Sequence, residues 1–441
     1  MNLKICIAIM ATIAVHAFDE LVLTIALPVI SEKLSLANVY GLTFAAYILS
    51  AVSGMRASGA YIDALGPRRV MNFGLALFMA GTIVSAVSWS GLVFILARAL
   101  QGLGGGVCIT TAFALINLVP DHLERRKLIT SIDFAWVIPS LAAPLIGGLL
   151  IDYLSWRAIF FIQLPVLIMV WLFFSGKLTQ FDKSEASPPW SVLADALGIS
   201  IGAGLSLYVL SFPPSPLWLV ALVGMSMSIW CFNRAMPEQW WQGKTDLSLP
   251  LLAGLLGFTA FYGMEAFQPL YLVQGLNMST TEAGIIVTFA SFSWLAASHT
   301  AMRLYRRYPP MRIMLGGSVI LFIGIVELGI VVFADLPSAG LYLGWAISGF
   351  GMGFIFNSAR TSAMENAPKG KEGFVSTAIT LSINMGIAAS AGIGGIIKNM
   401  NTETQSDLKT VILSITAFGL VVCFTNILII SARHRNTTQA A

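Results

Sequence analysis

The chain has 441 residues, of which 57% are apolar and only 10% are charged, and its formal net charge is +4. A soluble globular protein carries about 25% charged residues, so this composition excludes a soluble fold and predicts an all-α integral membrane protein. The basic residues are spread over many short segments, which excludes a nucleic-acid-binding patch.

Cysteine and histidine give no sign of a metal site. The four cysteines (Cys6, Cys108, Cys231 and Cys423) lie in apolar runs without CxxC spacing, and the four histidines are scattered. We therefore expect buried thiols, no metal and no cofactor.

Apolar segments in chain order predict fourteen membrane-spanning helices, arranged six, two, six. Each has roughly the 20 residues that cross a ~30 Å hydrocarbon core, whereas barrel strands need only about ten. The first segment continues to Ile30, beyond the apolar region of a signal peptide. The predicted spans are 4–31, 39–63, 69–88, 91–118, 126–151, 157–177, 190–212, 216–233, 247–274, 282–303, 311–334, 338–360, 373–399 and 409–431.

The basic residues also predict the orientation of the spans. With the N-terminus in the cytoplasm, 18 of the 25 Lys and Arg residues fall in cytoplasmic segments, and 4 fall on the opposite side. Cytoplasmic loops are enriched in Lys and Arg, and a miscounted span would invert every later loop. We therefore expect an even number of spans with both termini in the cytoplasm of a cell that carries the protein in its inner or plasma membrane.

The first span contains the stretch HAFDELVLTIALP (16–28), which places Asp19 and Glu20 side by side in the bilayer. An ionisable group there costs at least ~2.5 kcal/mol, so both acids should face protein or a water path. Adjacent helical residues point about 100° apart, and His16 is within reach of either acid. Arg98 of the fourth span has a depth comparable with that of Asp19, so we expect the two to pair. Protonation of the acid would free the arginine, a switch that a proton gradient can drive.

Further polar side chains in the spans are candidates for a substrate cavity. Arg56 and Asp133 have similar depths and are expected to pair, the alternative being that each reaches water at a helix end. Glu265 follows an aromatic and glycine-rich stretch suited to a cavity wall, whereas Glu327, in an aliphatic helix, is expected to form an inter-helix hydrogen bond. The predicted cavity residues are His16, Arg56, Asp133, Glu265 and Gln268.

The loop after the second span reads GAYIDALGPRRV (59–70). Gly59 is expected to allow close helix approach, Asp63 ends the span, and Gly66 makes the turn. Arg68 and Arg69 follow on the cytoplasmic side. A turn with positive-inside charges would explain much of this, but the ordered acid and bases also predict a charge-mediated contact that controls the conformational cycle.

This loop resembles the signature G-x-L-x-D-R-x-G-R-R/K of the major facilitator superfamily, with departures at Tyr61, Ala64 and Pro67. ARALQGLGGG (97–106) resembles the R-x-x-Q-G motif of that superfamily. SLAAPLIGGLL (140–150) is similar to its antiporter motif G-P-x-x-G-G, in which Ala143 replaces a glycine. DELVLTIALP (19–28) and SWRAIFFIQLP (155–165) resemble signatures of the fourteen-spanner drug/proton antiporters, with Gln163 in place of Asn.

The resemblance implies the major facilitator fold, with two six-helix bundles and two extra linking helices. It places an N-terminal bundle at 1–177, the linker with its two transmembrane helices at 178–246, a C-terminal bundle at 247–431 and a cytoplasmic tail at 432–441. Asp19 matches the acid of the family, with Glu20 as an extra one. The matched motifs make Pro144, Gly147 and Gly148 gating residues, beside the loop residues.

The internal repeat that this fold implies is weak in the sequence. A comparison of 59–74 with 301–316 matches Pro67 with Pro309 and Gly74 with Gly316. The glycine clusters at 102–106 and 349–354 are expected to serve close helix packing rather than nucleotide binding. No Walker motif is present, which excludes ATP-driven pumping by this chain.

By resemblance, the expected function is proton-coupled export of hydrophobic, cationic compounds by alternating access. The expected partners are a small-molecule substrate, protons and the lipid bilayer, without nucleic acid. One alternative is an exporter of a lipid or an anionic metabolite, in which Arg56 would contact the substrate. A membrane-embedded enzyme is disfavoured because the sequence has neither a metal cluster nor a catalytic triad.

Overall fold

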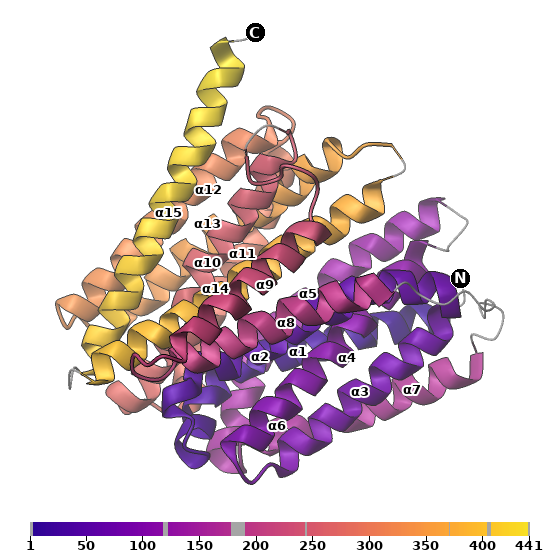
Figure 1. Ribbon diagram of the computed structural model, residues 1–441. Coiled ribbons are helices and arrows are strands. Elements are labelled where there is room, and N and C mark those ends of the chain that lie inside the picture. Colours follow the sequence, from indigo (N-terminus) through magenta and orange to yellow (C-terminus); the bar gives the residue numbers. More distant parts are fainter. Residues whose placement is uncertain are drawn as a thin grey trace. The chain divides into compact units, whose positions relative to one another are not determined.

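The computed structural model describes residues 3–117, 122–177, 190–242, 245–369, 371–403 and 407–439. These residues form helices and no strand, which confirms the predicted all-α fold (Figure 1). The chain separates into two compact units, unit 1 (Met1–Phe232) and unit 2 (Asn233–Ala441). The division falls near the end of α9 (Trp218–Ala235), so that α8 (Trp190–Leu210) and most of α9 belong to unit 1.

Unit 1 follows the first eight predicted spans, with one interruption. Its other elements are α1 (Leu3–Lys33), η1 (Ala37–Val39), α2 (Tyr40–Leu65), α3 (Pro67–Val87), α4 (Gly91–Asn117), α5 (His122–Tyr153), α6 (Ala158–Phe161) and α7 (Leu164–Lys177). The predicted span 157–177 is divided between α6 and α7. The break precedes Pro165, which has no N–H to donate to the carbonyl four residues earlier.

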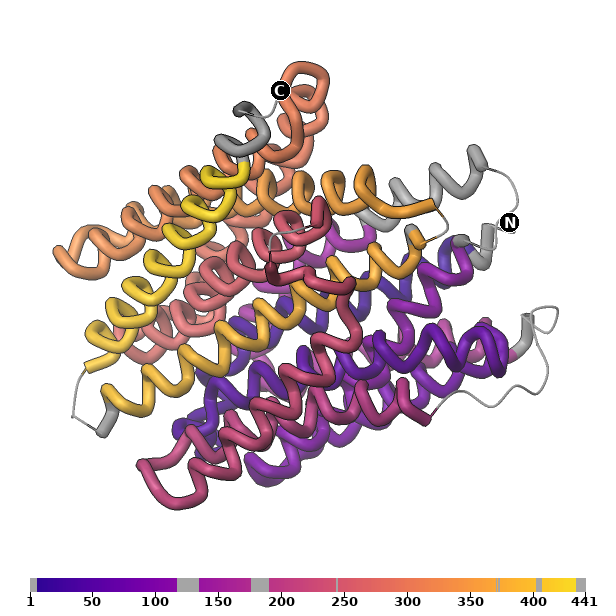
Figure 2. Tube along the Cα trace, turned by 45° about the horizontal axis from the view of Figure 1, so that its top comes forward, coloured from indigo at the N-terminus to yellow at the C-terminus, as the bar shows by residue number. Residues whose placement is uncertain are grey.

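Unit 2 contains six long helices at the places of the last six predicted spans. They are α10 (Ser248–Leu270), which continues into the π-helical turn η3 (Tyr271–Gly275), α11 (Thr280–Leu304), α12 (Pro310–Phe333), α13 (Ala339–Glu365), α14 (Glu372–Glu403) and α15 (Leu408–Gln439). Figure 2 shows α15 in yellow at the end of the chain.

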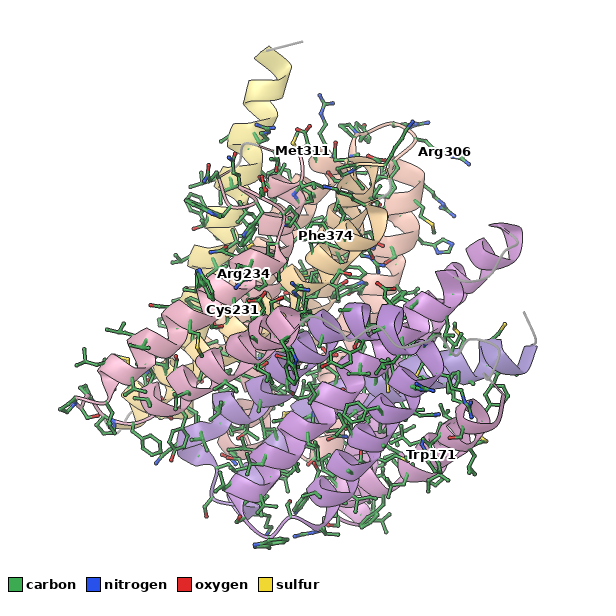
Figure 3. All side chains as sticks on the ribbon, turned by 45° about the vertical axis from the view of Figure 1, so that its right-hand side comes forward. Trp171, Cys231, Arg234, Arg306, Met311 and Phe374 are labelled. Carbon is green, nitrogen blue, oxygen red and sulfur yellow. The ribbon has the colours of Figure 1, made fainter. Side chains whose placement is uncertain are left out.

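Twelve helices within the described residues are long and apolar enough to cross a membrane. Two predicted spans, those on α2 and α9, are not among them. Every residue of α2 from Tyr40 to Met55 is buried, and α2 packs against both α4 and α8. Its neighbours, rather than lipid, surround much of it, so polar and small residues are tolerated there. By contrast, α7 exposes Ile168, Met169 and Trp171, the last at the periphery of unit 1 (Figure 3).

Glycines of α4 set its distance from both neighbouring helices. A Cβ at Gly102 would lie 2.1 Å from the carbonyl oxygen of Tyr47 in α2, and one at Gly104 would lie 2.4 Å from the backbone nitrogen of Phe78 in α3. A Cβ at Gly106 would lie 2.1 Å from the carbonyl oxygen of Ala51 in α2. The glycine cluster therefore serves close helix packing, as expected from the sequence.

The same arrangement recurs in unit 2, where α13 packs against α11 and α12. A Cβ at Gly349 would lie 2.2 Å from the carbonyl oxygen of Ala290 in α11, and one at Gly351 would lie 2.4 Å from the backbone nitrogen of Leu321 in α12. In α12 the glycine that meets Gly351 is Gly317, whereas a Cβ at Gly316 would meet none of the described atoms within 4 Å. The sequence match of Gly74 with Gly316 was therefore wrong by one residue, because packing makes Gly317 the equivalent.

This packing predicts that the same substitution changes thermal stability differently at two glycines of unit 2. Gly351→Ala should lower the thermal unfolding midpoint of the detergent-purified protein, because overpacking costs about 1–3 kcal/mol. Gly316→Ala, the matched control in open space, should leave the midpoint unchanged or raise it, because alanine favours a helix by about 1 kcal/mol over glycine. Equal midpoints for the two variants would contradict the close approach of α12 and α13.

Candidate functional site

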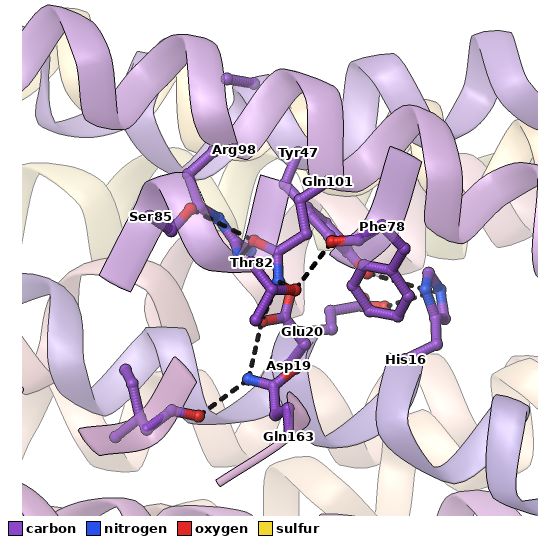
Figure 4. A network of polar contacts seen from close by, with 12 residues as sticks. His16, Asp19, Glu20, Tyr47, Phe78, Thr82, Ser85, Arg98, Gln101 and Gln163 are labelled. Carbon is purple, nitrogen blue, oxygen red and sulfur yellow. Dashed lines mark hydrogen bonds and ion pairs between the residues drawn. The ribbon is translucent and has the colours of Figure 1, made fainter. Parts of the chain in front are cut away.

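Asp19 of α1 lies at the centre of a buried polar network in unit 1 (Figure 4). Its side chain has no exposed surface and accepts three hydrogen bonds. Arg98 Nη1 donates to Oδ2 at 2.8 Å, while Gln101 Nε2 and Gln163 Nε2 donate to Oδ1 at 2.8 Å and 3.1 Å. The ion pair expected from the sequence is therefore formed, and two amides support it.

Arg98 of α4 is fully buried and is held from several sides. Besides Asp19, its Nη1 donates to Gln101 Oε1 at 2.7 Å, and its guanidinium lies 4.3 Å from the ring centroid of Tyr47. Its Nε and Nη2 have no hydrogen-bond partner among the residues that the structure describes. Burying a guanidinium with unsatisfied N–H donors costs free energy of folding. The burial of Arg98 therefore depends strongly on its ion pair with the Asp19 carboxylate.

Three local features bring the side-chain amides of Gln101 and Gln163 to Asp19. Gln101 follows Arg98 by three residues, so both side chains lie on one face of α4. A Cβ at Gly81 of α3 would lie 2.5 Å from the Gln101 backbone nitrogen, and this close approach lets Gln101 Nε2 donate to Thr82 Oγ1 at 2.9 Å. Gln163 sits in the break between α6 and α7, where its Nε2 also donates to the Ile159 carbonyl at 2.9 Å.

His16 and Glu20 lie beside this network, one turn apart on α1. Both are buried, at 2% and 7% exposure. His16 Nδ1 lies 2.7 Å from the Tyr47 hydroxyl, and His16 Nε2 lies 3.8 Å from Glu20 Oε2. The expected contact of His16 is thus with Glu20 and not with Asp19. The 3.8 Å separation is an ion-pair distance and too long for a hydrogen bond.

Arg56 of α2 pairs with a residue that the sequence analysis did not consider. Its Nη2 lies 3.8 Å from Asp195 Oδ2 of α8, and Asp195 is 4% exposed. The sequence predicted Asp133 as the partner of Arg56, but the side chain of Asp133 is not among those that the structure describes. Next to the ion pair, Ser53 donates to the Ala196 carbonyl, and Ser200 donates to the Leu49 carbonyl. These contacts attach α8 to α2, so Arg56 has a structural partner within the described part of unit 1.

A model of the Major Facilitator Superfamily matches residues 9–393. The chain belongs to the Major Facilitator Superfamily. Its members are transporters and not enzymes, which rules out the membrane-embedded enzyme and makes the substrate a small molecule.

Relatives of this superfamily member are similar along most of their length. The multidrug efflux pump SdrM of Staphylococcus aureus is 23% identical over 78% of this chain and 81% of its own. The multidrug transporter protein MdtP of Bacillus subtilis is 25% identical over 82% of this chain and 69% of its own. The multidrug resistance protein Stp of Mycobacterium tuberculosis is 26% identical over 81% of this chain and 68% of its own.

Solved structures of other superfamily members share the fold. The POT family transporter PepTSo has a TM-score of 0.71 at 14% identity, over 98% of each chain. The D-xylose-proton symporter has a TM-score of 0.67 at 14% identity, over 96% of this chain and 97% of that one. At such low identity the likeness shows the fold alone.

In the superfamily loop after α2, the structure supports some of the expected roles and contradicts one. Gly66 has a φ of 81°, which a side chain would strain, so its turn requires glycine. Arg68 Nη2 donates to the Ser175 carbonyl near the end of α7 at 2.5 Å, whereas Asp63 and Arg69 are exposed. A Cβ at Gly59 would meet no described atom within 4 Å, so the expected close approach there was wrong for the part of the chain that the structure describes.

The antiporter-like motif of α5 faces α1. Pro144, Gly147 and Gly148 are all buried. A Cβ at Gly147 would lie 2.3 Å from Val22 Cγ2, one turn from Asp19 on α1. The motif therefore sets the distance of α5 from the helix that carries Asp19.

The candidate residues of unit 2 lie on α10 and α12. Glu265 and Gln268 of α10 are 5% and 0% exposed, and within the described part of the chain neither amide atom of Gln268 has a hydrogen-bond partner. Glu327 Oε2 is buried against the bare backbone of Gly344, where a Cβ would lie 2.0 Å away, and no described residue is its hydrogen-bond partner. The inter-helix hydrogen bond expected of Glu327 is therefore absent at that atom, because glycine offers no side chain to donate.

Several members of the network had no assigned role in the sequence analysis. Gln101 and Gln163 appeared only as parts of motifs, although the i,i+3 spacing of Arg98 and Gln101 was a usable signal. Tyr47 and Thr82 reach the site from α2 and α3 across helix contacts. No local pattern in the sequence marks either residue.

The buried pair predicts strong coupling between Asp19 and Arg98 in stability. Arg98→Met should lower the free energy of unfolding by about 3–5 kcal/mol, because it leaves a buried carboxylate unpaired. The double variant Asp19→Asn/Arg98→Met should recover most of this loss, since no charge remains. Unfolding midpoints in detergent measure the cycle, with Arg69→Met, at an exposed arginine, as the control. Additive losses in the double variant would contradict a stabilising ion pair.

Proposed function

We propose that this transporter exports hydrophobic, cationic drug-like compounds and is driven by protons that bind at Asp19. The observation that carries the proposal is the fully buried ion pair of Asp19 with Arg98. A proton on Asp19 removes the charge that holds Arg98, and it weakens the hydrogen bonds from Gln101 and Gln163 at the same time. One protonation event thus changes the contacts of α1 with α4 and with the α6–α7 break.

The direction of transport and the substrate class come from the relatives, whose names describe multidrug efflux and resistance. Buried acids also favour a cation over an anion as substrate, since Glu20 and Glu265 are buried in addition to Asp19. The excess of basic residues in the predicted cytoplasmic segments supports a location in the cell membrane with both termini inside. Alternating access between the two sides of the bilayer completes the proposal.

The first test addresses proton coupling. Asp19→Asn should abolish uphill export of a cationic dye such as ethidium, because the amide cannot carry the proton. Downhill exchange of the dye should survive in proteoliposomes, which separates loss of coupling from loss of folding. Glu32→Gln changes an exposed acid of the same helix and should leave both activities intact. Full uphill export by Asp19→Asn would remove Asp19 from the mechanism.

The second test separates cationic from anionic substrates. Glu265→Gln should weaken binding of cationic dyes about tenfold to a hundredfold, the equivalent of a charged contact of roughly 1.5–3 kcal/mol, and should spare neutral compounds. Arg56→Gln should mainly lower the unfolding midpoint, because Asp195 loses its described ion-pair partner. Dye binding to purified variants measures the first effect.

The opposite pattern would favour the alternative function. If Arg56→Gln loses ligand binding while Glu265→Gln binds its ligands as the wild type does, the result would point to export of a lipid or an anionic metabolite.

A further inference from the structure

The side chains of His16, Glu20 and Tyr47 form a second buried group next to Asp19, and the proton coupling proposed above does not use it (Figure 4). Tyr47 joins the two groups. Its hydroxyl contacts His16 Nδ1, while Arg98 lies over its ring. A Cβ at Gly105 of α4 would lie 2.7 Å from His16 Nδ1 and 3.0 Å from the Tyr47 hydroxyl, so this contact needs a glycine opposite it.

The charges of the two groups balance only with a bound proton. Among the described side chains, the charged or titratable groups around Glu20 and Tyr47 are His16 and Asp19 of α1 and Arg98 and Cys108 of α4. Phe78 of α3 and Trp136 of α5 place aromatic rings against His16. Arg98 neutralises Asp19, which leaves the Glu20 carboxylate without a cation unless the His16–Glu20 pair holds one proton.

The two acids also differ in access and in partners. Asp19 is sealed, with no exposed side-chain surface and three donors, whereas 8% of the Glu20 side chain is exposed. Asp19 faces a permanently charged guanidinium, but Glu20 faces an imidazole that can itself take up or release a proton. A proton can therefore enter or leave the His16–Glu20 pair without breaking the pair of Asp19 and Arg98.

We infer that His16 and Glu20 form a second proton-binding site, so that each transport cycle moves two protons. The inference rests on the proposed proton-driven export. Exchange of one proton for one monovalent cation moves no net charge across the membrane. Exchange of two protons for one such cation moves one positive charge inward per cycle, and the membrane potential then drives export.

The test measures this charge in proteoliposomes with ethidium as the monovalent probe. The ethidium gradient at zero net flux is determined while the pH difference and the potassium–valinomycin potential are varied independently. The wild-type gradient should change about tenfold for each 59 mV of potential, as expected for one net charge. Glu20→Gln should lose this voltage response and keep export driven by the pH difference, and Glu20→Asp should restore the response. Glu32→Gln should behave as the wild type.

A voltage response that persists in Glu20→Gln, or that is absent from the wild type, would overturn the second site. Loss of all uphill export in Asp19→Asn would still support the proposed function in that case, so the two failures are distinguishable. A second measurement needs no substrate. Infrared difference spectra of the purified protein, titrated in H₂O and D₂O, should show a protonated carboxylic acid that Glu20→Gln removes and Asp19→Asn retains.

His16→Gln covers the case in which Glu20→Gln does not fold. It should shift the titration of that infrared band, because Glu20 would lose the imidazole that lies at ion-pair distance from it. Titration of the band at the wild-type pH in this variant would also overturn the inference.

Discussion

The buried ion pair between Asp19 and Arg98 is the constraint on which the rest of unit 1 depends. Two opposite charges in a medium of low dielectric stabilise each other best when their remaining hydrogen-bonding atoms are also satisfied. Gln101 and Gln163 meet that need at Asp19, whereas Arg98, whose Nε and Nη2 have no hydrogen-bond partner among the described residues, is covered on one face by the Tyr47 ring. The pair therefore fixes the positions of α1, α2, α4 and the α6–α7 break relative to one another.

The packing repeat shows which part of the site is specific to unit 1. Gly81 meets the backbone of Gln101, and Gly324 of α12 meets the backbone of Ser348 in the same way. By this register Ser348 is the equivalent of Gln101, and Trp345, three residues earlier, is the equivalent of Arg98. Both arginine and tryptophan are fully buried, but Trp345 packs edge-on against Phe261 of α10 at a centroid distance of 5.6 Å. The two units thus share a helix-packing scheme, while unit 2 has an aromatic contact where unit 1 has an ion pair.

The sequence was informative wherever a residue type is rare for its setting. A charged side chain in an apolar span costs free energy unless it has a partner of opposite charge. The similar depths of Asp19 and Arg98 in the bilayer were therefore enough to predict that they pair. Glycine clusters in spans predicted close packing for a similar reason. Gly59 shows the limit of that argument, because a single glycine does not reveal whether another helix lies opposite it.

The partners of the charges were harder to predict, since they depend on contacts between distant helices. Asp195 lies in α8, 139 positions beyond Arg56 in the sequence, and only the packing of α8 on α2 makes it a partner. Gln163 reaches Asp19 because Pro165 interrupts the span there, an effect of one missing N–H that a count of apolar residues does not detect.

The arrangement explains how a small chemical event can act on large helices. Glycine contacts bring the backbones of α2, α3 and α4 so close that these helices have little room to move against one another. Asp19, by contrast, is held to Arg98 of α4 and to Gln163 by hydrogen bonds that its charged carboxylate oxygens accept. Loss of that charge weakens the contacts of α1 and leaves the glycine contacts intact. Protonation should therefore move α1 and the α6–α7 break against a rigid group formed by α2, α3 and α4, because dispersion contacts between backbones do not depend on the charge of a carboxylate.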